Sequence, residues 1–103
     1  MTYELMNTIL TELALPFAYD HFREPPTGNA YVAYFESDKI RFLADDVVYH
    51  HEPHFAVELY TAFKDPTLEG TLMELFERHE VPWSGGDSVW IESEKMYQTV
   101  FYV

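Results

Sequence analysis

Apolar residues near the start of the chain have the spacing of an amphipathic helix. Four of them fall at i, i+3, i+4 and i+7 and form one stripe: Met6, Ile9, Leu10 and Leu13. Thr2 is a suitable N-cap, and Pro16 prevents continuation because proline has no amide hydrogen to donate. The pattern therefore predicts a helix over residues 2–13.

A second helix is predicted after Asp65. Aspartate is a favoured N-cap, and Pro66 suits the first helical position because its amide would have no partner there. The apolar positions that follow mark the buried face of this helix: Leu68, Leu72, Leu75 and Phe76.

Strand patterns occupy most of the remaining chain, in segments rich in β-branched and aromatic residues. We predict strands at residues 15–22, 30–36, 47–61, 81–83 and 88–103. Turn-forming residues fill 24–29 and 84–87, and the polar residues 92–95 predict a bend or bulge in the last strand. Pro53 interrupts the third strand, which places that part of it on a sheet edge or at a bulge.

Alternation along the third strand separates two faces. Phe55, Val57 and Leu59 share one parity, whereas His54 and Glu58 lie on the other. The element order α-β-β-β-α-β-β predicts an α+β fold, with a mainly antiparallel sheet flanked by two helices on one face. A chain of 103 residues with 48% hydrophobic residues fits one domain over residues 1–103.

Charge restricts the partners. The chain has 6 Lys and Arg against 18 Asp and Glu, a net charge of −12, and its cations are scattered singly. Binding to DNA or RNA requires clustered cations, so we expect no direct nucleic-acid binding and no binding to an anionic membrane.

Without cysteine the chain has no thiolate ligand or cysteine nucleophile. No apolar run is long enough to span a bilayer, and the first residues lack the basic start of a signal peptide, so we expect cytosolic synthesis.

The best candidate metal ligands are His50, Glu52 and His54. On a regular strand these three side chains point the same way, and imidazole with carboxylate suits zinc or nickel. The alternative is a polar, solvent-facing side of an amphipathic strand. We favour it because strand residues two apart converge poorly on one tetrahedral ion, and we expect neither metal nor cofactor.

Catalytic motifs are missing from the sequence. The paired carboxylates at 45–46, 77/80 and 92/94 are expected by composition alone in so acidic a chain. Ser84 lies in a predicted turn without the context of a nucleophile elbow, and there is no phosphate-binding loop. We therefore predict that the protein is not an enzyme.

Aromatic residues make up 17% of the chain, with eight Tyr and eight Phe. They exceed the needs of a small core, which predicts surface that is buried on oligomerisation, although a core-only role stays open. The polar segment 37–46 contains three apolar residues, Ile40, Phe42 and Leu43. These residues either contact a partner or anchor the segment to its own core.

Two segments together carry a resemblance to a known group of proteins. They are FAVELYT followed by KDP (55–61 and 64–66) and IESEKMYQTVFY (91–102), with AYDHF (18–22) and YVAY (31–34) in support. This combination resembles small tail-component proteins of long-tailed phages and prophages of Gram-positive bacteria.

The resemblance implies a tail terminator or tail-to-head joining protein with a sheet flanked by helices. Such proteins form rings, commonly hexameric, that cap the tail tube and meet the head connector. It implies as partners further copies of the chain, tail-tube proteins and head-connector proteins, in the host cytoplasm during assembly and then in the virion tail or neck. The family offers no catalytic residues to transfer. The alternative is a monomeric acidic protein-binding module, such as an inhibitor or a mimic of DNA charge.

Overall fold

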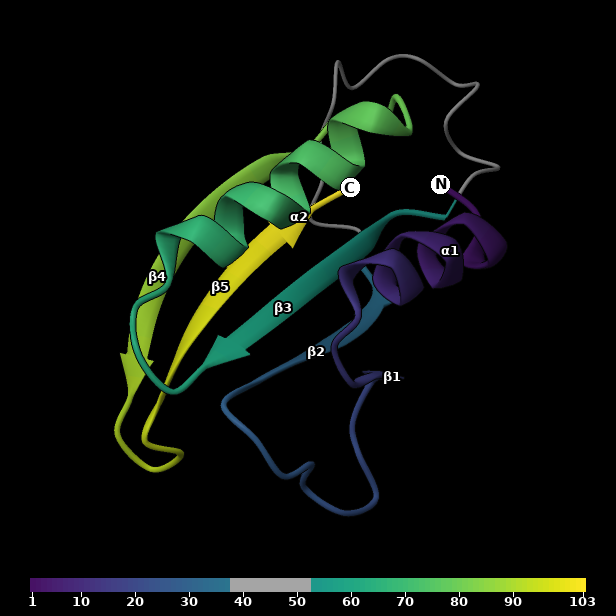
Figure 1. Ribbon diagram of the computed structural model, residues 1–103. Helices are drawn as coiled ribbons and strands as arrows, with labels where there is room; N and C mark the ends of the chain where they lie inside the picture. Colours follow the sequence, from purple (N-terminus) through teal and green to yellow (C-terminus); the bar gives the residue numbers. More distant parts are fainter. Residues whose placement is uncertain (38–52) are drawn as a thin grey trace.

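A computed structural model describes residues 1–37 and 53–103 (Figure 1). Its elements follow the predicted order α-β-β-β-α-β-β. They are α1 (Tyr3–Leu13), β1 (Phe17–Tyr19), β2 (Ala30–Glu36), β3 (Phe55–Thr61), α2 (Pro66–Arg78), β4 (Ser84–Ile91) and β5 (Met96–Tyr102).

The strands form one sheet in the order β1-β2-β3-β5-β4. The short β1 runs parallel to β2, and the other three neighbouring pairs are antiparallel, which confirms the predicted α+β class. β5 lies between β3 and β4, so the last strand pairs with strands on both of its sides. β1 and β4 are the two edges of the sheet.

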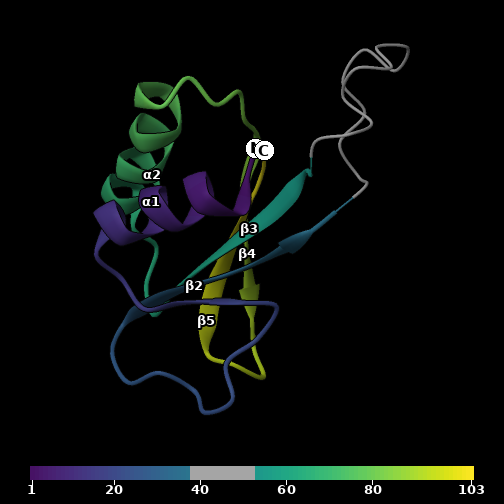
Figure 2. The same ribbon diagram turned by 90° about the vertical axis from the view of Figure 1, so that its right-hand side faces the viewer.

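Both helices pack on the same face of the sheet, and the opposite face carries no helix of the described chain (Figure 2). The core lies between these two layers. Phe55, Phe76 and Phe101, from β3, α2 and β5, are fully buried there. Burying each such side chain contributes about 1.5–3 kcal/mol, so this layer is the main source of stability. The predicted stripe of α1 and most of the predicted face of α2 lie in it: Met6, Ile9, Leu10, Leu13, Leu72, Leu75 and Phe76.

The helices begin where the sequence predicts. Thr2 caps α1 by accepting a hydrogen bond from the amide of Leu5 at 3.0 Å. Asp65 caps α2 in the same way through the amide of Leu68 at 3.1 Å. These caps satisfy amides that have no partner within the helix.

The predicted strand over 15–22 is shorter in the structure, where β1 covers Phe17–Tyr19. Asp20 ends it by adopting a φ of 67°, while its amide still donates to the carbonyl of Tyr34 at 2.6 Å. Pro53 precedes β3 and lies in no strand, so within the described residues the predicted third strand is confirmed only over Phe55–Thr61. Residues 47–52 of that predicted strand lie outside the described residues.

The predicted strand at 81–83 and turn at 84–87 are also wrong. Residues 81–83 form no strand, and β4 starts at Ser84. Gly85 and Gly86 have φ values of 90° and 93°, and the register shifts between Gly85 and Asp87. The glycine pair therefore forms an irregularity inside a strand, which only residues tolerant of positive φ accommodate. The polar residues 92–95 are the turn that joins β4 to β5.

Candidate interaction site

The sheet face that the helices leave open has a regular side-chain lattice. Residues paired across antiparallel strands point to the same side, so the register places them in rows that run across the sheet. The rows on β2, β3 and β5 are Phe35–Ala56–Tyr102, Ala33–Glu58–Val100 and Tyr31–Tyr60–Gln98. The alternation in the sequence places Glu58 opposite the core, and the structure confirms this.

Aromatic rings and one hydrogen-bond chain organise this open face. The rings of Tyr31 and Tyr60 stack with their centroids 5.0 Å apart. The amide of Gln98 donates to the hydroxyl of Tyr60 at 2.9 Å, and this hydroxyl donates to the carboxylate of Glu58 at 2.9 Å. Such a chain holds the three polar groups in fixed relative positions.

Tyr60 titrates at unusually high pH. Burial raises its pKa to about 12, because the phenolate form loses hydration there. The hydrogen bond from Gln98 favours the phenolate and opposes this shift, whereas the bond to Glu58 and the negative charge of Glu58 add to it. Tyr60 is therefore a neutral hydrogen-bond donor to Glu58 at physiological pH.

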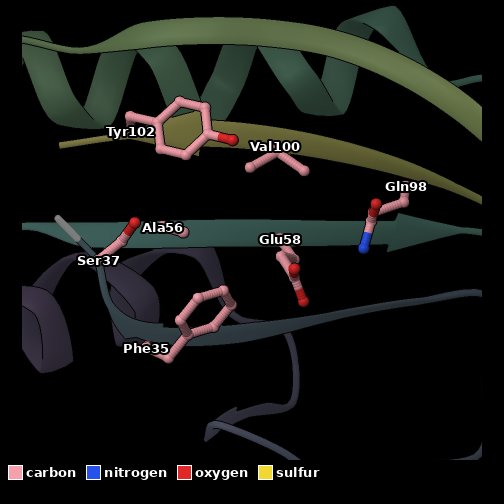
Figure 3. Close-up of a pocket in the computed structure, with 7 residues that line it drawn as sticks. All are labelled: Phe35, Ser37, Ala56, Glu58, Gln98, Val100 and Tyr102. Atoms are coloured by element: carbon pink, nitrogen blue, oxygen red, sulfur yellow. The ribbon is translucent and has the colours of Figure 1, made fainter. Parts of the chain in front are cut away.

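A shallow pocket of about 190 Å³ lies on the same face (Figure 3). Ala56 is the small residue at one end, and Phe35 and Tyr102 lie on opposite sides of it. Among the described residues, Glu58 is the one carboxylate that lines this pocket. The lining residues are Phe35, Ser37, Ala56, Glu58, Gln98, Val100 and Tyr102.

The outer edge of β4 is a second exposed feature. Val89 is 55% exposed and Trp90 is 44% exposed, and Asp87 is the single charged residue of this strand. Natural edge strands are commonly protected by lysine, proline or short length, and β4 has eight residues with neither lysine nor proline. The bulge at its start leaves the part from Asp87 onward available for pairing. The other edge strand, β1, has three residues and therefore offers few backbone groups for pairing.

A buried polar cluster joins α2 to the β4–β5 hairpin on the helix side of the sheet. The ammonium of Lys64 lies 2.6 Å from the carboxylate of Glu69 and 2.7 Å from the hydroxyl of Ser88. Ser88 and Thr99 share a hydrogen bond of 2.6 Å, and both lie 3.5 Å from Glu69. Local sequence patterns do not indicate this cluster, because its members come from a loop, a helix and two strands.

The pairing of Lys64 with Ser88 resembles a serine–lysine dyad, but its surroundings do not suit that chemistry. A lysine acts as a general base only when it is neutral, because an ammonium has no lone pair to accept the hydroxyl proton. Glu69 stabilises the charged ammonium at 2.6 Å. The cluster is therefore suited to holding α2 on the hairpin.

Most of the predicted site residues lie outside the described residues. This holds for His50 and Glu52 of the metal candidate and for Ile40, Phe42 and Leu43 of the predicted interface. His54 lies directly before β3, and its carbonyl accepts a hydrogen bond from the amide of Ser37 at 2.8 Å. Among residues 1–37 and 53–103, no group of three His, Asp or Glu side chains is placed to hold a metal ion.

One pair of the candidate catalytic carboxylates lies in an exposed turn. Glu92 and Glu94 are exposed in the hairpin turn, where Lys95 pairs with Glu92 and, with Trp90, holds the pKa of that carboxyl below its usual range.

Within the described chain, no helix is long and apolar enough to cross a membrane. Comparison of the chain with protein-family models, with curated proteins and with solved structures found no match.

Proposed function

We propose that this chain is a structural protein of a phage or prophage, a ring-forming subunit of the tail end or neck that acts in tail completion or head–tail joining. The observation that carries the proposal is the unprotected β4 edge, with Val89 and Trp90 exposed along it. An edge strand presents unpaired amides and carbonyls, which pair readily with another chain.

A ring explains why this edge is left unprotected. In a head-to-tail ring each subunit offers one surface to the next, and closure leaves no unused copy of either surface. The aromatic residues of the open sheet face support the same reading, since Tyr31, Tyr60 and Tyr102 are half-buried in the single chain. Tyrosine is enriched at protein interfaces because its ring is apolar while its hydroxyl can form hydrogen bonds.

The acidic character fits this role. A net charge of −12 repels the DNA backbone, so a ring of such subunits does not bind DNA that passes through it. The partners under this proposal are further copies of the chain, tail-tube proteins and head-connector proteins, and neither nucleic acid nor a membrane is among them. No step of this role requires catalysis.

A second candidate function is a monomeric acidic module that inhibits a basic protein or mimics DNA. The net charge of −12 favours it, because a dense negative surface attracts basic proteins over a long range. Under this alternative the β4 edge has no partner and the protein stays monomeric at high concentration.

Native mass spectrometry of the purified chain, alone and with assembled tail tubes, separates the two functions. We expect a closed ring, six times the monomer mass, and its loss in Val89→Lys, which adds a charge to the edge strand. Phe63→Lys is the matched control, because Phe63 is 57% exposed against 55% for Val89 but lies outside the strands. A strict monomer under both conditions, or equal loss in the two variants, contradicts the proposal.

A further inference from the structure

We propose that the pocket over Ala56 receives a basic side chain, preferably arginine, from a partner protein. The pocket lies on the open sheet face, away from the β4 edge, so this inference does not depend on ring formation. It rests on three features: two aromatic residues separated by a small one, a carboxylate with no cationic partner among residues 1–37 and 53–103, and the charge of the whole chain.

The aromatic pair has the separation that a slender side chain requires. Phe35, Ala56 and Tyr102 are aligned on the neighbouring strands β2, β3 and β5. Neighbouring strands lie about 4.8 Å apart, so the backbones of Phe35 and Tyr102 are separated by about 9.5 Å. The methyl group of Ala56 lies at the base of the space between them and is itself only 2% exposed, and Figure 3 shows the two rings on either side of it. The apolar stem of an arginine or lysine packs well on such rings.

Glu58 supplies the charge that recognises the head group. It follows Ala56 by two residues on β3, about 7 Å along the strand, and points to the same face. One of its oxygens accepts the hydroxyl of Tyr60 at 2.9 Å, which orients the carboxylate. Within residues 1–37 and 53–103, no lysine, arginine or histidine forms an ion pair with Glu58. Its negative charge is therefore available to a cation from outside the described chain.

The chemistry of the pocket excludes other occupants. An apolar side chain would cover Glu58 and remove its hydration without replacing it, which is costly for a carboxylate. An anion would be repelled by Glu58 and by the net charge of −12. Arginine is preferred to lysine because its guanidinium is planar, more weakly hydrated and able to bond a carboxylate through two N–H groups. The same net charge attracts a basic partner surface before contact.

The experiment is an NMR titration of the full chain with N-acetyl-arginine amide. We expect saturable shifts of the backbone amides of Ala56, Glu58, Val100 and Tyr102, with a Kd on the order of 1 mM, typical of one side chain. N-acetyl-citrulline amide has the same shape without the charge, and we expect it to bind at least about tenfold more weakly. N-acetyl-lysine amide is expected to fall between the two.

Two variants test the assignment to Glu58. Glu58→Gln keeps the size of the side chain and should weaken arginine binding by about tenfold, consistent with the loss of a charge-assisted hydrogen bond. Glu74→Gln removes the same charge from an exposed position on α2 and should leave the binding unchanged. Their amide spectra report whether each variant is folded. Equal binding of citrulline, equal binding by Glu58→Gln, or equal weakening in both variants would overturn the proposal, whatever the oligomeric state.

Discussion

The ammonium of Lys64 lies 2.6 Å from the carboxylate of Glu69, whose side chain is only 8% exposed. Glu69 belongs to the first turn of α2 and faces Ser88 and Thr99 of the β4–β5 hairpin. A carboxylate at a helix N-terminus is favoured by the helix dipole, but burial makes it depend on its partners. Lys64 therefore connects the start of α2 to the sheet.

Removal of this partner should destabilise the protein. We expect Lys64→Ala to lower the free energy of unfolding by about 1–2 kcal/mol, because Glu69 is left buried with hydroxyl partners alone. This effect is at the low end for a buried ion pair because the Lys64 side chain is itself 45% exposed. Urea unfolding measures the change. The control is Lys95→Ala, which breaks the exposed pair with Glu92 and should leave stability close to unchanged. Equal effects of the two variants would show that burial of Glu69 is unimportant.

Two of the four glycines, Gly85 and Gly70, should respond oppositely to alanine. A Cβ on Gly85 would lie 2.5 Å from the carbonyl oxygen of Val100, at a φ of 90° that alanine rarely adopts. We expect Gly85→Ala to cost at least about 2 kcal/mol, since strain and a backbone clash combine. Gly70 lies in α2 with no atom within 4 Å of a new Cβ, so Gly70→Ala should stabilise by about 0.5–1 kcal/mol. Thermal unfolding compares them, and destabilisation by Gly70→Ala would contradict the open surroundings described here.

Ala14 provides a further test of backbone conformation. It ends α1 with a φ of 64°, where glycine is the favoured residue. We expect Ala14→Gly to raise the free energy of unfolding by about 0.5–1 kcal/mol, since relief of left-handed strain exceeds the added entropy of the unfolded chain. Urea unfolding measures the gain. A loss of stability would mean that the methyl group of Ala14 contributes more than the strain costs.

Alkaline stability should depend on Tyr60. Its pKa is about 12 in the folded protein, against about 10 in an unfolded chain. Between these values the unfolded chain releases a proton that the folded protein retains. The stabilisation is therefore fully present below about pH 10 and is lost as the pH rises toward about 12.

The variant that removes this titration is Tyr60→Phe. Between about pH 9 and about pH 11, the free energy of unfolding should fall by about 0.5–1 kcal/mol less in this variant than in the wild type. This difference in the free energy of unfolding is small because the ring of Tyr60 is only partly buried. Urea unfolding at the two pH values checks it, and parallel losses in the two proteins would mean that Tyr60 does not contribute.

The helices and the core face could be predicted because their determinants are local. Thr2, Asp65 and Pro66 fix the helix starts within one turn, and the alternation in β3 assigns Glu58 to the open face. The first half of β4, residues 84–87, was missed because Gly85 and Gly86 are typical of a turn, and only pairing with β5 draws them into the sheet. Residues 88–91 were predicted as the start of the last strand. Local sequence carries no information on that pairing.

The pocket could not be predicted for a related reason. Phe35 and Tyr102 are 67 positions apart in the sequence, and they lie on either side of Ala56 only because β5 inserts next to β3. Their register depends on backbone pairing over long loops, whereas their side chains show no pattern of their own. The buried cluster around Glu69 depends on the same insertion, since Thr99 belongs to β5.

The position of β5 in the sheet also affects how the protein folds during its synthesis. Phe55 and Val103 exchange two backbone hydrogen bonds, at 2.9 and 3.0 Å, which close the β3–β5 ladder at the start of β3. On the ribosome, the side of β3 that pairs with β5 therefore remains an unpaired, apolar edge until β5 has emerged. Nascent chains stalled before residue 96 would expose that edge to neighbouring chains, so pairing with β5 is the step that protects it against aggregation.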